Sequence, residues 1–318
     1  MRFESARAWT ARGGAVALVV AVLVGLFAPQ LFGPSGLSLA YLVLYYLCLT
    51  AAWNLFSGFS GYFNFGYVVF IGIGMYFSAV AIADYKIAWP IAYLSGGAGA
   101  ALFAAVIGYP VLRTRGVYFS IAMLAIAEGM RVLFGTEYLE PWTRGGRGLP
   151  VTGGDLEYQY WAMFGLALAI LALTWVVARS RFGLSLVAVR EDETAAGGLG
   201  VNATRVKFIA FVASAFFAGA AGGVHATFLH YIDPPAAFDL RYTTMPIIMA
   251  IFGGMGTVLG PVVGAVALEI VNDLTWLHLG RLNMTIFGII LIVLVFWLPE
   301  GLVVRLKEAG LLRKTRSI

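Results

Sequence analysis

Long apolar runs separated by short polar segments dominate this chain. A helix needs about 20 apolar residues to cross a bilayer, and most of the runs reach or approach that length. The pattern therefore predicts a membrane protein that crosses the bilayer many times. The predicted spans are 15–32, 37–56, 62–83, 87–112, 117–134, 160–178 and 208–231, then two shorter pieces, 243–252 and 258–270, and finally 282–298.

Composition supports one polytopic, all-α membrane domain rather than soluble domains. Hydrophobic residues make up 61% of the 318 residues and charged residues 12%, whereas soluble domains carry about 25% charged residues. The single cysteine, Cys48, excludes a disulfide framework and a cysteine-based zinc site. The net charge of +5 could indicate nucleic-acid binding. We exclude that function, because the basic residues gather at the ends of the apolar runs, as membrane topology requires.

The distribution of basic residues predicts the orientation. With the N-terminus in the cytoplasm, fifteen of the 21 Lys and Arg residues lie on the inner side, as the positive-inside rule requires. A basic C-terminus is also inside only if 243–252 and 258–270 run in and back out as a pair, which makes about ten membrane segments. The N-terminal run could be a cleaved signal peptide, but no clear small-residue cleavage site follows it, so we expect an uncleaved first helix.

This count divides the chain into five parts. We expect a cytoplasmic N-terminus (1–14), six membrane segments (15–178), a cytoplasmic loop (179–207), four membrane segments (208–299) and a basic cytoplasmic tail (300–318).

The segment 179–207 is a charged, glycine-punctuated island between two apolar runs. It is either a solvated loop whose arginines anchor the topology or a short helix that docks on a cytoplasmic partner. Glu191, Asp192 and Glu193 suit a helix N-terminus, where negative charge is favoured. The small residues 194–199 could then lie close to another surface, and Gly200 with Asn202 offers a stop. We favour docking.

The segment 54–74, NLFSGFSGYFNFGYVVFIGIG, combines glycines with polar residues inside an apolar run. Asn54, Ser57 and Asn64 must face protein or water, because hydrocarbon does not satisfy them, and Gly58 and Gly61 allow close helix packing. The segment therefore indicates tight packing with internal hydrogen bonds, part of a translocation pathway, or both.

Two further features carry alternatives. The run GGMGTVLGP, with Gly253, Gly254 and Gly256, is either the turn of the short pair or a broken helix that lines the pathway. Glu128 stands three residues before Arg131, so the two can pair along one helix face, although charges inside spans are often functional.

The chain carries no recognisable catalytic centre. The three histidines have no metal-ligand spacing, and we expect them at the membrane interface rather than around a metal. The sequence contains no glycine-rich phosphate loop ending in Gly-Lys-Ser or Gly-Lys-Thr, so the chain itself should not bind ATP.

Several segments together resemble a known family. NLFSGFSGYFNFGYVVFIGIGMY, LRTRGVYFSIAMLAIAEGMR, RFGLSLVAVREDETAAGGLGVNATRVKFIAF, IFGGMGTVLGPVVGA and WLPEGLV are similar, in order and rough spacing, to LivM-type permease subunits of branched-chain amino-acid ABC importers. Two positions depart from the pattern. Tyr67 stands where the family often has histidine or glutamine, and the loop reads TRGGRG instead of threonine, two glycines, proline and asparagine.

The resemblance implies a permease of the bacterial inner membrane with the ten-helix fold of the cobalamin importer. Its implied partners are a LivH-type second permease, two ATP-binding subunits that hold ATP and Mg²⁺, and a periplasmic substrate-binding protein. Relatives carry urea, short amides or aromatic acids as well as leucine, isoleucine and valine. The family's ATPase-coupling segment maps onto Arg190, Glu191, Asp192, Glu193, Ala195, Ala196 and Gly200.

Two other functions compete with this one. A secondary transporter or channel that acts alone would need ionisable groups in mid-membrane, and the chain offers little beyond Glu128 and Glu269. An integral membrane enzyme would need several polar groups around one cavity, and the sequence gives no sign of them.

Overall fold

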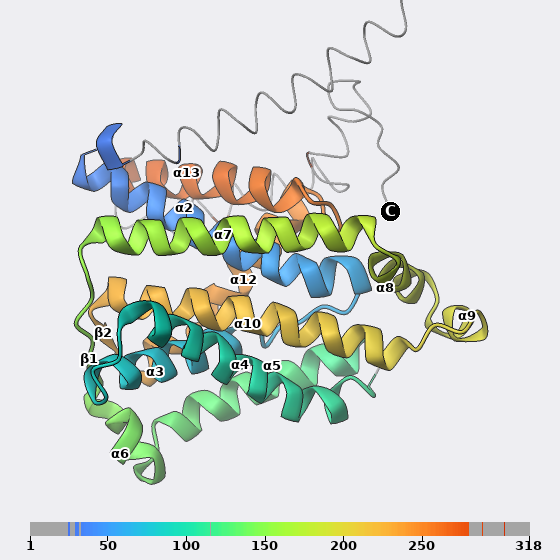
Figure 1. Ribbon diagram of the computed structural model, residues 1–318, viewed down its shortest axis with the longest axis horizontal. Coiled ribbons are helices and arrows are strands. Elements are labelled where there is room, and N and C mark those ends of the chain that lie inside the picture. Colours follow the sequence, from blue (N-terminus) through green and yellow to red (C-terminus); the bar gives the residue numbers. More distant parts are fainter. Residues whose placement is uncertain are drawn as a thin grey trace, which may run out of the picture.

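A bundle of long helices forms the molecule in the computed structural model, which describes residues 33–114 and 116–279 together with residues 25, 29–31, 288 and 302. The helices run roughly side by side, so the bundle has two ends (Figure 1). The elements are α2 (Pro34–Trp53), the π-helix η1 (Asn54–Gly58), α3 (Val68–Ala83), α4 (Trp89–Val111), α5 (Val117–Phe134), η2 (Glu137–Leu139), α6 (Glu140–Thr143), η3 (Gly145–Arg147), β1 (Leu149–Pro150), α7 (Leu156–Arg179), α8 (Arg181–Glu191), α9 (Glu193–Gly198), α10 (Ala203–Leu229), β2 (Tyr231–Ile232), α11 (Pro234–Ala237), α12 (Arg241–Gly253) and α13 (Gly260–Leu279).

Six helices among the described residues are long and apolar enough to cross a membrane, and α3 is a shorter apolar helix. Eight of the ten predicted segments fall on helices, namely α2, α3, α4, α5, α7, α10, α12 and α13. The predicted spans 15–32 and 282–298 and the two termini lie outside the described residues, apart from isolated positions. An all-α polytopic membrane protein is thus confirmed.

Several predicted boundaries differ from the structure, most at the start of α3 and the end of α13, and α10 begins at Ala203 instead of Phe208. The span predicted from Tyr62 begins at Val68, because residues 62–67 form an irregular segment that is nonetheless apolar. The last short piece does not stop at Ile270 but continues as α13 to Leu279. The prediction ended it where polar residues such as Asn272 and Asp273 begin, but these residues continue the same helix. The sequence between α12 and α13 is the predicted turn, with Gly254 and Gly256 at positive φ.

Helix α10 is the centre of the bundle and packs against α2, α3, α4 and α7. Small residues allow its backbone to approach its neighbours closely, as in other membrane helix interfaces. A Cβ at Gly74 of α3 would lie 2.1 Å from the carbonyl oxygen of Gly219, and one at Gly219 would lie 2.6 Å from that of Gly96 of α4. The three helices therefore meet at glycines.

The two ends of the bundle differ in character. At one end α8 and α9 connect α7 to α10, and at the other the antiparallel pair β1–β2 lies with α6 (Figure 1). In that pair Leu149 is opposite Ile232 and Pro150 is opposite Tyr231. We call them the loop end and the ribbon end.

Candidate functional site

The charged island 179–207 contains two helices rather than one. The short helix predicted after Asp192 is present as α9, and the Asp192 carboxylate caps it by accepting hydrogen bonds from the N–H groups of Thr194 (2.7 Å) and Ala195 (2.9 Å). Sequence reasoning missed α8, whose N-terminus is capped by Ser180. Its buried residues Gly183, Leu186 and Val189 recur every three positions, and this spacing was the available signal.

Gly200 ends the short helix as predicted, but Asn202 acts differently. Gly200 adopts φ +87°, and the following Val201 N–H donates to the carbonyl of Ala196 at 3.0 Å, which is the type of closure found at helix C-termini. Asn202 instead begins α10, because its side chain accepts from the N–H of Arg205 at 3.0 Å. The link between α9 and α10 is therefore short and turns at a glycine.

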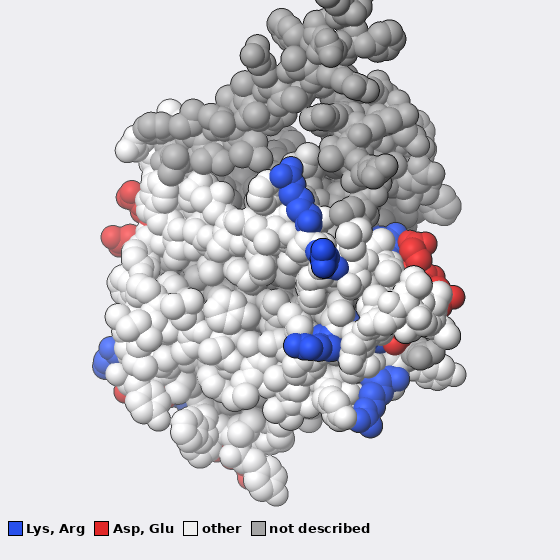
Figure 2. Space-filling view, turned by 45° about the vertical axis from the view of Figure 1, so that its right-hand side comes forward, with Lys and Arg blue, Asp and Glu red and all other residues white. Residues whose placement is uncertain are grey.

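Much of this loop faces outward. Glu191, Asp192 and Ala195 are exposed, Glu193 is half-buried and Ala196 is buried beneath them. Figure 2 shows the molecule turned so that the loop end comes forward. Lys and Arg side chains are spread over the face in view, and acidic side chains lie at its edge. Among the described residues, the exposed basic ones at the loop end are Arg113, Arg179, Arg181, Arg190 and Arg205.

Arg190 connects the loop to the bundle. Its Nη1 donates a hydrogen bond to the carbonyl oxygen of Gly58 at 3.1 Å. Two glycines flank the side chain: a Cβ at Gly61 would lie 2.9 Å from Arg190 Cγ, and one at Gly256 would lie 2.8 Å from Nη1. Both glycines also have positive φ, 75° and 77°, so an L side chain there is disfavoured twice. We call Gly58, Gly61 and Gly256 the arginine cradle.

Asn54 connects the end of α2 to the α12–α13 turn, which contains Gly256 of the cradle. Its Nδ2 donates to the carbonyl of Thr257 at 2.9 Å, and its Oδ1 accepts from the N–H of Gly256 at 2.8 Å. Asn54 opens the π-helix η1 at the end of α2, and π segments are frequent at functional sites. The segments 54–61 and 253–261, which the sequence presents as separate features, thus meet the loop at one place.

Ser57, Ser60 and Asn64, in the segment 54–74, are buried and hydrogen-bonded internally. Ser57 Oγ accepts from the N–H of Asn64 at 3.3 Å, and Asn64 Oδ1 accepts from the N–H of Gly66 at 3.0 Å. The prediction that they are satisfied within the protein is confirmed. These contacts give them a packing role, and their part in a pathway stays a prediction.

Glu193 lies on the inner side of the loop, against a lysine. The Nζ of Lys207, on α10, donates to Glu193 Oε1 at 2.9 Å and to the Tyr62 hydroxyl at 2.9 Å. The Tyr62 hydroxyl in turn donates to Glu193 Oε2. Sequence reasoning counted Lys207 only as a topology anchor. The signal was its helical spacing from the buried residues Ala210, Phe211 and Ser214, which places Lys207 on the buried face of α10.

Other predicted residues lie apart from this site. Glu128 and Arg131 pair on α5, with Arg131 Nε donating to Glu128 Oε2 at 2.9 Å, and both side chains are exposed. Gly253 lies at the end of α12, where a Cβ would lie 1.8 Å from the carbonyl oxygen of Gly260, so it serves the close packing of α12 on α13. Gly254 ends α12 at φ 119°.

The prediction of interface histidines was wrong for His225. This side chain is buried in the bundle, within 3.2 Å of the hydroxyls of Tyr41 and Tyr242, and it stacks on Tyr45 with ring centres 4.0 Å apart. The prediction rested on the position of His225 toward the end of an apolar run, and it could not include the tyrosine rings that stack on this side chain. Within the described part of the chain, no group of three or more potential metal ligands gathers.

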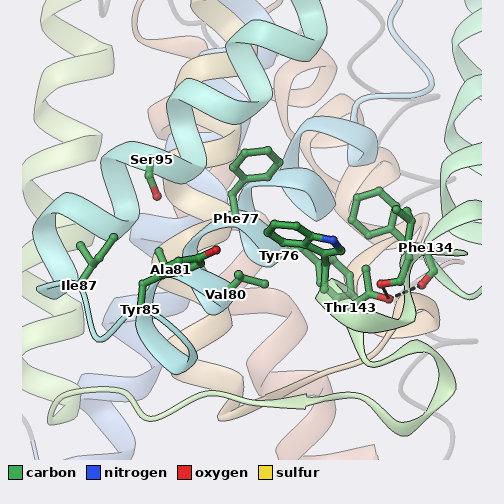
Figure 3. A pocket seen from close by; sticks show the side chains of 11 residues that line it. Tyr76, Phe77, Val80, Ala81, Tyr85, Ile87, Ser95, Phe134 and Thr143 are labelled. Carbon is green, nitrogen blue, oxygen red and sulfur yellow. Dashed lines mark hydrogen bonds between the residues drawn. The ribbon is translucent and has the colours of Figure 1, made fainter.

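A cavity of about 460 Å³ lies toward the ribbon end, between the α3–α4 connection and α5–α6 (Figure 3). Aromatic and aliphatic side chains line it, among them Tyr76, Phe77, Phe134 and Trp142. The Thr143 hydroxyl donates a hydrogen bond to the carbonyl oxygen of Phe134 at 3.0 Å. The residues that line the cavity include no charged group, so it does not suit a zwitterionic solute, and the loop end remains the candidate site.

The fold and the loop define a class: a polytopic helical membrane protein with a charged helical loop between α7 and α10, tied into the bundle by Arg190. The family model for the branched-chain amino acid transport system permease component matches residues 36–295. The chain belongs to that family.

Individual relatives agree with this assignment. The chain is 27% identical over 316 residues to the high-affinity branched-chain amino acid transport system permease protein LivM of Salmonella typhimurium, and 26% identical over 315 residues to LivM of Escherichia coli. Each alignment covers 90% of this chain and 74% of the relative. It is also 32% identical to the E. coli permease protein LivH over 139 residues, which are 43% of this chain and 44% of LivH. No solved structure matches the chain significantly.

Proposed function

We propose that this chain is the membrane permease subunit of an ATP-driven importer for branched-chain amino acids or a related small polar solute, such as urea, a short amide or an aromatic acid. It would form half of the translocation pathway beside a LivH-type permease. The family assignment and the similarity to both LivM and LivH support this proposal. Two ATP-binding subunits would supply ATP hydrolysis with Mg²⁺, and a periplasmic binding protein would deliver the solute.

In this proposal the loop end faces the cytoplasm of a bacterial inner membrane, and both termini lie on the same side. The exposed arginines of the loop end support the orientation, because basic residues concentrate on the cytoplasmic side. With segments 15–32 and 282–298 added, the eight described helices give the ten-segment layout of a cobalamin-importer-type permease.

The arginine cradle is the observation that carries the proposal. An ATPase subunit that presses on the exposed face of α8 and α9 also moves Arg190, which is bonded to Gly58 at the end of α2 and seated against Gly256 in the α12–α13 turn. Displacement of the loop is thereby passed to three membrane helices at once. Alternating access follows if the two ATPase states each favour one packing of these helices.

Glu191→Arg tests the docking role, because Glu191 is exposed and its change leaves the cap of α9 intact. We expect a folded membrane subunit whose complex, reconstituted in proteoliposomes with its ATPases, loses solute uptake and solute-stimulated ATP hydrolysis. Unchanged coupled hydrolysis would overturn the docking role. Solute uptake by the purified chain alone would replace the proposal with a secondary transporter. A thermal-shift screen of the binding protein against leucine, urea, acetamide and benzoate addresses the substrate.

A further inference from the structure

Lys207 is buried at the junction of four segments of the chain. Its side chain is 1% exposed, and its Nζ lies within hydrogen-bond reach of Glu193 on α9, of Tyr62 before α3 and of the Leu112 carbonyl (3.4 Å) at the end of α4. A buried ammonium group is costly unless it is paired and hydrogen-bonded. The position is therefore held by specific partners rather than by hydrophobic packing.

Three kinds of partner compensate the charge. Glu193, whose side chain is 18% exposed, supplies a carboxylate. The C-terminal end of α4 presents carbonyl oxygens, toward which the helix dipole favours a cation. The ring of Tyr62 lies under Nζ at 4.1 Å from its centre, a cation–π arrangement. Because the Tyr62 hydroxyl also bonds Glu193, the three side chains form a closed triangle.

The triangle connects α9 and α10 across the turn between them. The chain turns at Gly200, with φ +87° and no atom within 4 Å of the place where a Cβ would stand. Backbone hydrogen bonds such as the one from Val201 N–H to the Ala196 carbonyl lie close to this turn, so the angle between the two helices depends on contacts farther along them. Glu193 is the first residue of α9, at the end away from the turn, and Lys207 lies in the second turn of α10. A bond between them fixes the angle between the two helices.

We propose that Glu193, Lys207 and Tyr62 lock α9 to α10 so that both move as one rigid body, which makes these three residues the positioning residues for transmission from loop to bundle. The proposal rests on the function proposed above. The lock differs from a purely structural ion pair in one respect. Its loss changes the amount of solute transported per ATP hydrolysed, and not only the amount of complex that assembles.

Glu193→Gln is the main test, because it keeps the size of the side chain, removes the charge and leaves one acceptor oxygen where Glu193 uses two. Spin labels at Ala195→Cys on α9, away from the turn, and Ile209→Cys on α10 report the angle between the helices by electron paramagnetic resonance; both positions are exposed and native Cys48 is buried. We expect a narrow distance distribution when Glu193 is present and a broad one in the Glu193→Gln variant. An unchanged distribution would overturn the lock, and this measurement needs neither ATPases nor solute.

The second arm measures ATP hydrolysed per leucine taken up by the assembled complex. Glu193→Gln should raise this ratio about tenfold, and Tyr62→Phe, which keeps the ring and the ion pair, should raise it less. The double variant should equal the stronger single one. Asp84→Asn is the control, since it breaks an exposed ion pair with Arg144 (3.0 Å) at the ribbon end.

The outcomes separate the two proposals. A broadened distribution with an unchanged ratio, or hydrolysis and uptake that fall in proportion, would reduce the triangle to a stabilising contact. If the unaltered chain never assembles with an ATPase, the proposed function fails, while the spin-label result still decides whether the lock exists. Tyr62→Phe serves in the spin-label arm if Glu193→Gln does not fold.

Discussion

Helices α10 and α5 have the same mean hydropathy, 1.6 over their most apolar windows, yet 67% of that window is buried in α10 and 22% in α5. Hydropathy therefore indicates that both are suited to a membrane and says nothing about which is central. The difference lies in the side chains. The middle of α10 reads Ala-Gly-Ala-Ala-Gly-Gly from Ala218 to Gly223, whereas α5 exposes bulky residues such as Tyr118, Ile121 and Val132.

This contrast teaches that hydropathy does not distinguish the two helices, and that small residues accompany the central position of α10. In lipid, apolar side chains gain little by leaving their surroundings, so close backbone approach and van der Waals packing decide which helices associate. Helix α5 buries Phe119, Met123, Ala127 and Phe134 against the bundle, and Ile126 and Met130 are partly buried there. Its remaining surface is open to another subunit or to lipid.

The most direct test of this comparison is to make the same substitution, glycine to alanine, in both helices. In Gly219→Ala the added Cβ meets Ala100 Cβ at 2.4 Å, whereas around Gly129 of α5 nothing lies within 4 Å. We expect Gly219→Ala to lower the free energy of unfolding by about 3 kcal/mol through overpacking. Gly129→Ala should raise it by about 0.5–1 kcal/mol through helix propensity. Unfolding in mixed micelles measures both, and equal effects would refute the contrast.

The close packing of α10 has a counterpart in the arginine cradle, and a matched pair of glycines tests it. Gly256→Ala introduces strain at φ +77° and places a Cβ 2.8 Å from Arg190 Nη1, whereas Gly200→Ala introduces strain at φ +87° in open space. We expect losses of about 2 kcal/mol and about 1 kcal/mol respectively in unfolding free energy. A Gly256→Ala cost no greater than that of Gly200→Ala would mean that Arg190 moves aside freely.

Asn54→Ala removes both hydrogen bonds between α2 and the α12–α13 turn. The expected cost is about 1–2 kcal/mol, because the Gly256 N–H and the Thr257 carbonyl lose their partner. The same unfolding measurement applies, with Ser38→Ala on α2 as the control, since the Ser38 hydroxyl makes an exposed bond to its own helix. A cost no larger than that of the control would exclude Asn54 as the link.

The smallest effect is expected for Glu128→Gln on α5. The Glu128–Arg131 pair is exposed, with side chains 57% and 40% accessible, and exposed pairs add little to stability. The melting temperature of the isolated subunit should therefore stay unchanged, while Glu193→Gln in the buried pair with Lys207 should lower it. Equal shifts would mean that the exposed pair within α5 contributes as much to stability as the buried pair between Glu193 and Lys207.

Sequence reasoning reached the eight spans that the structure describes, the turn before α13 and the acidic start of α9, because each depends on local composition. It could not reach the cradle, since Arg190, Gly58 and Gly256 are joined only by the packing of distant helices. Residues 62–67 misled it because they are apolar without being helical. His225 misled it because its hydroxyl partners, Tyr41 and Tyr242, are distant in sequence.

The length of α10 gives the proposed lock a geometric consequence. The helix runs without a break for 27 residues from the loop end to the ribbon end, which is about 40 Å at 1.5 Å per residue. As a stiff lever of that length, it would convert a tilt of about 5° at Lys207 into a sideways swing of about 3.5 Å at its far tip. If the proposed lock holds, a modest push on the loop end would therefore be enough to change the helix packing at the ribbon end.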